Sequence, residues 1–139
     1  MFQNLVKYCV LLALLFHVSA FADLKSDFRQ AYKSYNQYLE AEDVPLALGA
    51  AADAYKLGLK LYGKKHITTA KLAINYASLL NDTGEYKKAA KTLKGKLKII
   101  EKAHGDDAHD LVSLLVELGR ANLDPNKPDK ALEHFQGAS

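Results

Sequence analysis

Apolar residues recur at three- and four-residue spacing through most of the chain, which is the pattern of amphipathic helices. In the middle of the chain this pattern covers residues 70–80 and residues 89–100, with a polar turn between them. No segment alternates apolar and polar residues for long enough to predict a strand. The predicted helices are Leu24–Ala41, Val44–Leu61, Thr68–Asn81, Glu85–Ala103, Ala108–Asn122 and Pro128–Phe135.

The first 22 residues follow a different pattern. A short polar start that carries Lys7 is followed by the apolar run Tyr8–Val18 and by the small residues Ala20 and Ala22. This order is typical of a secretory signal peptide, and the run is shorter than the roughly 20 residues that a membrane span needs. We predict cleavage after Ala22, with cleavage after Ala20 and retention as an uncleaved anchor as the alternatives. The protein is then periplasmic or secreted, with no stable membrane span after cleavage.

Composition narrows the chemistry of the cleaved chain. The 139 residues contain one cysteine, Cys9, which lies within the predicted signal peptide. The remaining residues 23–139 therefore exclude a disulfide framework, a cysteine zinc site and a cysteine nucleophile. Nineteen Lys and Arg against 16 Asp and Glu give a net charge of +3, which indicates neither a polyanion-binding arm nor an acidic disordered tail.

The chain repeats itself at a spacing of 42 residues. Ala47, Ala89 and Ala131 coincide at this spacing, and Gly63 falls on Gly105. Self-similarity at a fixed period predicts stacked helix pairs, and an unrelated helical bundle with accidental spacing is the alternative. The units are residues 28–69, 70–111 and an incomplete 112–139, so that residues 23–139 hold about 2.8 repeats.

The central unit carries a family resemblance. The motif AxxYAxxL at residues 73–80, followed by GEYxxAxxxL at residues 84–93, resembles a tetratricopeptide repeat. Residues 97–105 resemble the 42-residue variant of kinesin light chains and many bacterial proteins. The outer units depart from the pattern, because Glu42 replaces the turn glycine and Pro128 stands at an aromatic position. The resemblance implies an all-α, right-handed superhelical solenoid of antiparallel helix pairs.

The resemblance also implies a concave groove, lined by the first helix of each pair, that holds a peptide or a partner helix. The first unit aligns in two registers, so either Asn36 or Gln37 follows Lys33 one turn on. Asn81 and Glu117 are expected on the same face. Since Lys and Arg form charge-assisted hydrogen bonds, we expect a peptide with a carboxylate, and a hydrated surface without a ligand is the alternative. The predicted groove residues are Lys33, Asn36, Lys71, Asn75, Ser78, Asp82 and Arg120.

Other chemistry is poorly supported. The chain has no nucleophile elbow, phosphate-binding loop or zinc-protease motif, so we expect no enzyme and no cofactor. Residues 104–110 gather two histidines and three aspartates, which are metal-ligand types. We instead interpret this stretch as an exposed turn in which Asp106 or Asp107 caps the next helix, and we predict no metal.

Lysines cluster on one face of the predicted helix Glu85–Ala103. Lys87, Lys91, Lys94 and Lys98 share this face, largely opposite the apolar stripe. We interpret it as a solvated outer surface, with contact to an anionic surface as the alternative. Nucleic acid is not expected as a partner of an exported protein.

The last predicted helix, Pro128–Phe135, has an apolar face and no following helix in this sequence. Solenoids normally end in a helix with a polar outer side. We therefore expect an exposed apolar patch, self-association through this end, or a sequence that is a fragment. The alternative function is the N-terminal module of a longer protein, for example one with a TonB-type energy-transducing C-terminal domain.

Overall fold

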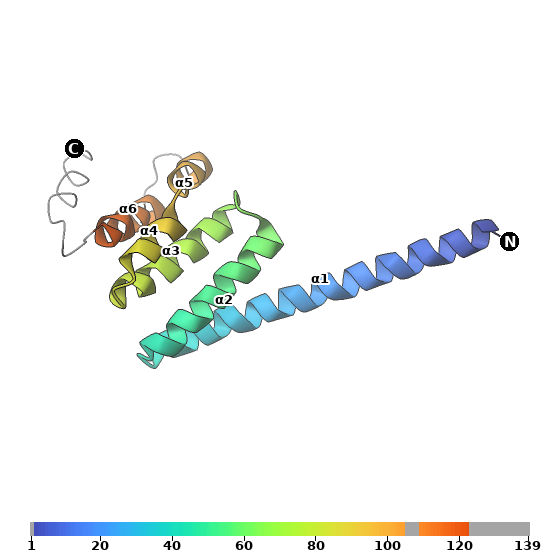
Figure 1. Ribbon diagram of the computed structural model, residues 1–139, viewed down its shortest axis with the longest axis horizontal. Coiled ribbons are helices and arrows are strands. Elements are labelled where there is room, and N and C mark those ends of the chain that lie inside the picture. Colours follow the sequence, from blue (N-terminus) through green and yellow to red (C-terminus); the bar gives the residue numbers. More distant parts are fainter. Residues whose placement is uncertain (1, 105–108, 123–139) are drawn as a thin grey trace.

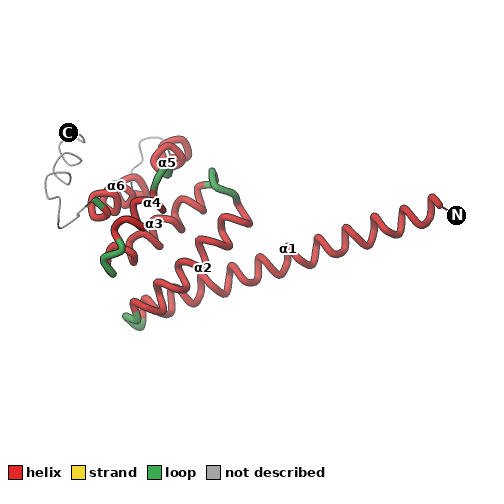
Figure 2. Tube along the Cα trace, in the orientation of Figure 1, coloured by secondary structure: helices red, strands yellow, loops and turns green. Residues whose placement is uncertain are grey.

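The computed structural model describes residues 2–104 and 109–122, which form helices joined by short turns (Figure 1 and Figure 2). Within these residues there is no strand, and the all-α prediction is confirmed. The helices are α1 (Phe2–Glu40), α2 (Val44–Tyr62), α3 (Ile67–Asp82), α4 (Tyr86–Leu93), α5 (Leu97–His104) and α6 (His109–Ala121).

The helices stack in chain order. α2 packs against α1 on one side and against α3 on the other, while α6 packs against α3, α4 and α5. The α1–α2 pair therefore lies at one end of the stack and α6 at the other (Figure 1). This open arrangement of helix pairs is the repeat architecture that the 42-residue spacing predicts, and it is not a closed bundle.

α1 is longer than the predicted helix Leu24–Ala41. It runs without interruption from Phe2 to Glu40, through the predicted signal peptide. The reason is local, because residues 2–40 contain neither glycine nor proline to end the helix. The N-terminal half of α1 projects away from the stack, and Val6, Tyr8 and Phe21 are exposed there (Figure 1). Among the described residues, no helix has the length and apolar character that a membrane crossing requires.

In the turn between α1 and α2, Glu42 adopts the backbone conformation for which the next repeat uses a glycine. Glu42 has a φ of +56°, and Gly84, its equivalent 42 residues later, has a φ of +78°. Both turns therefore contain a residue in the left-handed backbone conformation, which is unfavourable for any residue that has a Cβ. α2 then begins as predicted, because the Asp43 carboxylate accepts a hydrogen bond from the Leu46 N–H at 3.1 Å and Pro45 occupies the first turn.

The prediction of a single helix over Glu85–Ala103 is wrong. The chain instead forms α4 and α5, separated by a turn at Gly95, whose φ is +77°. The Lys96 N–H donates to the Leu93 carbonyl at 3.0 Å, and the Lys96 carbonyl accepts from the Ile100 N–H at 3.1 Å. Because the apolar residues keep their helical spacing across the break, the periodicity gave no sign of it.

The core combines small residues on α2 with large ones on later helices. The buried face of α2 consists of alanines and a glycine, which lets α3 approach closely. A Cβ at Gly58 would lie 2.4 Å from Leu72 Cδ1, and the Thr69 hydroxyl donates to the Gly58 carbonyl at 3.3 Å. Tyr55 and Tyr76 join the same two helices, with ring centroids 6.0 Å apart. The fully buried large side chains are Leu80, Leu93, Ile100 and Leu114.

Several predictions concern residues outside the described part of the chain. The predicted helix Pro128–Phe135, with its expected exposed patch, lies there, as do residues 105–108 of the histidine–aspartate stretch. In the part that is described, no group of three or more potential metal-ligating side chains occurs. α6, at His109–Ala121, begins and ends within one residue of the predicted helix Ala108–Asn122.

Candidate functional site

Polar side chains link α3 to α6 along the side of the stack where the groove is predicted. At one end, Lys71 Nζ lies 2.9 Å from Asp110 Oδ2. At the other end, Arg120 hydrogen-bonds to the Asp82 carboxylate. We call this set of links the α3–α6 seam. Its members are Lys71, Asn81, Asp82, Asp110, Glu117 and Arg120.

A buried amide–carboxylate pair forms the inner layer of the α3–α6 seam. Asn81 Nδ2 donates to Glu117 Oε2 at 2.8 Å and to the Glu117 carbonyl at 3.0 Å. Asn81 and Glu117 are only 3% and 8% exposed. A carboxylate so poorly hydrated needs compensating donors, and Arg120 Nη1 supplies them at 3.1 and 3.2 Å from the two carboxylate oxygens. Asn81 Oδ1 is buried without a hydrogen-bond partner among the described residues.

Arg120 connects the buried and exposed parts of the α3–α6 seam. Its hydrogen bond to Asp82 is the main cause that raises the pKa of Arg120, and the charge of Glu117 adds to it. The guanidinium therefore remains charged between two carboxylates. With Lys71 and Arg120 against Asp82, Asp110 and Glu117, the α3–α6 seam contains more acidic than basic groups. A ligand carboxylate would have to compete with these acids for either cation.

The seven predicted groove residues fall into two groups. Lys71, Asn75, Ser78 and Asp82 share one face of α3, and Arg120 joins this face from α6. Lys33 and Asn36 are exposed on α1. Among the described residues, no hydrogen bond or ion pair joins Lys33 or Asn36 to α3 or α6.

Burial of Asn81 and Glu117 is the feature that the sequence did not reveal. Both were expected on the groove surface, because helical spacing places them near the accessible positions. The structure turns them inward, where each partly satisfies the other. One signal was available: Asn81 directly follows two leucines on the most deeply buried helix, a position where a polar side chain needs a partner.

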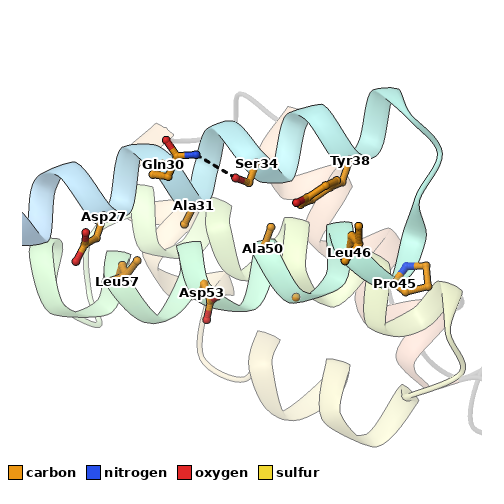
Figure 3. Close-up of a pocket in the computed structure, with 11 residues that line it drawn as sticks. Asp27, Gln30, Ala31, Ser34, Tyr38, Pro45, Leu46, Ala50, Asp53 and Leu57 are labelled. Atoms are coloured by element: carbon orange, nitrogen blue, oxygen red, sulfur yellow. Dashed lines mark hydrogen bonds between the residues drawn. The ribbon is translucent and has the colours of Figure 1, made fainter.

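A hollow of about 490 Å³ lies along the α1–α2 pair (Figure 3). Figure 3 shows side chains from both helices lining it, among them Ala31, Ala50 and Leu57, with Asp27 and Asp53 as its carboxylates. The Gln30 amide donates to the Ser34 hydroxyl at 3.5 Å at its edge. The hollow contains none of the predicted groove residues.

Comparison with known proteins identifies the repeat. A family model of the tetratricopeptide repeat matches residues 68–138, beginning on α3. The chain belongs to the tetratricopeptide repeat family. No curated protein matches the chain. Tetratricopeptide repeats generally mediate protein–protein interaction and form a non-catalytic scaffold. The α1–α2 pair precedes the matched residues and adds a further antiparallel helix pair to this tetratricopeptide repeat stack.

Proposed function

We propose that this tetratricopeptide repeat protein is an exported scaffold that binds a protein or peptide partner in the groove lined by α1, α3 and α6. One observation carries the proposal. From Thr69 to Asp82, every residue of α3 is buried except Lys71, Asn75, Ser78 and Asp82. Between residues 69 and 82 the accessible face of α3 is therefore entirely polar, and its four residues are all predicted groove residues.

The hydrogen bonds of this face suggest how a partner is held. Lys71 and Arg120 are engaged by acids of the α3–α6 seam. Asn75 and Ser78 are half-buried and make no side-chain hydrogen bond among the described residues. An amide and a hydroxyl can both donate to and accept from a peptide backbone. We assign the first ligand contacts to Asn75 and Ser78. The excess of carboxylates beside them favours partner side chains that are neutral or basic.

Site-specific photocrosslinking tests the groove. A photoreactive amino acid is placed at Asn75 on α3 or, as a matched control, at the exposed Lys56 on α2. The full-length protein is expressed in the cells that naturally produce it, so that its partners are present. We expect a discrete adduct from position 75 that is absent from position 56 and is weakened by Ser78→Ala. Equal adducts from both positions, or none from position 75, would contradict the proposal.

Export is a separate part of the proposal. It is supported by the order of polar start, apolar run and small residues in the sequence, and by the exposed Val6, Tyr8 and Phe21 on the projecting part of α1. Such exposed apolar side chains are unfavourable in water and suit a segment that is removed after translocation. N-terminal sequencing of protein recovered from the periplasm should begin at Asp23. Full-length protein confined to the cytoplasm would contradict export without affecting the groove.

A further inference from the structure

A hollow of about 610 Å³ lies beside the break between α4 and α5, next to the first turn of α3. It lies between α5 and the segment that joins α2 to α3, with Gly95 of the break at its edge. We call it the basic notch. The residues that define it are Lys65, Ile67, Lys98, Ile99, Lys102 and Ala103. None of the predicted groove residues lines it.

The charged side chains that line the described part of the basic notch are all lysines, and the exposed His66 lies among them. Lys65, Lys98 and Lys102 are exposed, and none of them forms an ion pair with a carboxylate of the described residues. Among the described residues that line the hollow there is no Asp or Glu. Lys64 and Lys96 lie close to each other beside these residues, and burial and then the charge of Lys64 lower the pKa of Lys96.

The floor of the basic notch is apolar. Ile67 begins α3 and Ile99 lies on α5, and both line the hollow and are half-buried, whereas its lysines are exposed. A cationic rim around an apolar floor is complementary to a peptide in which carboxylates flank an apolar side chain. A purely polar anion would leave the floor uncovered, so charge and shape together favour a peptide over free phosphate.

The notch depends on the turn at Gly95. In an uninterrupted helix, residues 87, 91, 94 and 98 would form one continuous lysine face. The turn separates Lys87 and Lys91 on α4 from Lys98 and Lys102 on α5. Lys98 and Lys102 are one turn apart on α5 and share the hollow with Lys65 of the preceding turn.

We propose that the basic notch binds an acidic peptide segment of a partner protein, with its carboxylates on Lys65, Lys98 and Lys102 and an apolar side chain on Ile67 and Ile99. This site is distinct from the groove and does not rest on the groove binding a peptide. A scaffold with both sites would hold two segments, because the two sites share no lining residue.

Fluorescence anisotropy with a labelled dodecapeptide tests the notch. The probe carries one Phe between two Asp-Glu pairs, and its matched versions replace the acids by Asn and Gln or the Phe by Ser. Full-length protein should bind the probe, and both matched peptides should bind more weakly. Lys98→Glu/Lys102→Glu should weaken binding at least about tenfold, because two charge-assisted contacts become repulsive. Lys98→Arg/Lys102→Arg should retain it.

The control variant is Lys87→Glu/Lys91→Glu, which makes the same charge change at exposed positions of α4. It should change binding by about twofold or less, because long-range charge effects are screened. Melting temperatures measured by circular dichroism establish that each variant is folded. Equal losses for the two reversals, or equal binding of the Phe→Ser peptide, would reduce the site to non-specific attraction of anions and overturn the proposal.

Two further arms complete the test. The variant Asp106→Asn/Asp107→Asn removes the two carboxylates that follow α5 in the sequence. If this variant binds the labelled peptide more tightly than the wild type does, acids of this chain compete with the peptide for the same lysines, which would support the proposal. Failure of both the wild type and this variant to bind the probe would overturn the proposal. So would binding of phosphatidylglycerol vesicles that is lost on Lys98→Glu/Lys102→Glu while the peptide does not compete, since the notch would then serve a membrane surface.

Discussion

α2 and the α4–α5 segment occupy equivalent places in successive repeats and yet fold differently. α2 is one helix of 19 residues, whereas its counterpart is two helices of eight residues each. At the 42-residue spacing, Ala51 of α2 aligns with Leu93, Asp53 with Gly95 and Ala54 with Lys96. The continuous helix thus buries small residues, while the broken one anchors each part with a large side chain. The apolar stripe is similar in both, so the stripe alone does not decide whether a helix continues.

The largest expected effect concerns the anchors of the broken helix. Leu93→Ala removes a side chain that is 1% exposed, and it should lower the free energy of unfolding by about 2–5 kcal/mol. Ala51→Gly at the aligned position of α2 should cost only about 1 kcal/mol. Urea unfolding measures both. Similar losses at the two positions would contradict the contrast between a small-residue face and a large-residue anchor.

Gly95 tests whether the break is required. Gly95→Ala places a Cβ on a residue with a φ of +77°, and it should lower the free energy of unfolding by about 1–2 kcal/mol. Asp53→Ala in the continuous α2 should be neutral or slightly stabilising. Circular dichroism separates the two possible responses. A rise in helicity without loss of stability would mean that α4 and α5 fuse readily and that the turn is incidental.

Substitutions at the equivalent turns α1–α2 and α3–α4 should change the free energy of unfolding by smaller amounts and in opposite directions. Glu42→Gly should stabilise the fold by less than about 1 kcal/mol, because relief of the left-handed strain is partly offset by the flexibility of glycine in the unfolded chain. Gly84→Ala at the equivalent turn should destabilise the fold by about 1 kcal/mol. Thermal unfolding of both variants provides the measurement. Destabilisation by Glu42→Gly would indicate that the Glu42 side chain contributes a contact of its own.

The smallest effect concerns Lys96, which is 7% exposed and lies over the Tyr55 ring, with Nζ 5.7 Å from its centroid. Burial, followed by the charge of Lys64, lowers the pKa of Lys96. The unfolded chain therefore binds more protons than the folded chain between the two pKa values, so stability rises with pH through this window toward the unfolded value of about 10.4.

Substitution of Lys96 removes this pH dependence. Relative to Lys96→Met, the wild type should become more stable as the pH rises toward about 10.4. The wild type should also become more stable relative to Lys96→Arg as the pH rises, because neither Met nor Arg titrates in this range. Urea unfolding at several pH values provides the measurement. If the stability difference from the wild type changes with pH for only one of the two variants, the pH dependence belongs to a group other than Lys96.

The helix ends that could be predicted are those with a local chemical cause. The start of α2 follows from Asp43 and Pro45, whose cap and fixed φ act within a few residues. The break at Gly95 could not be predicted from periodicity, because Leu93, Leu97 and Ile100 keep the spacing of one helix. The pairing of Asn81 with Glu117 could not be predicted either, since it joins residues 36 positions apart.

The sequence by itself determined that this protein is a stack of helix pairs, because helical spacing and a 42-residue period are properties of the chain. It also predicted that Lys71, Asn75, Ser78 and Asp82 share one polar, accessible face of α3, but it placed the buried Asn81 on that face as well. Only the tertiary structure decided how charges are used. It engages Lys71 and Arg120 with acids of α3 and α6, and it gathers Lys65, Lys98 and Lys102 without such partners among the described residues. The physical reason is that an ion pair depends on distance in space, which neither composition nor spacing along a helix specifies.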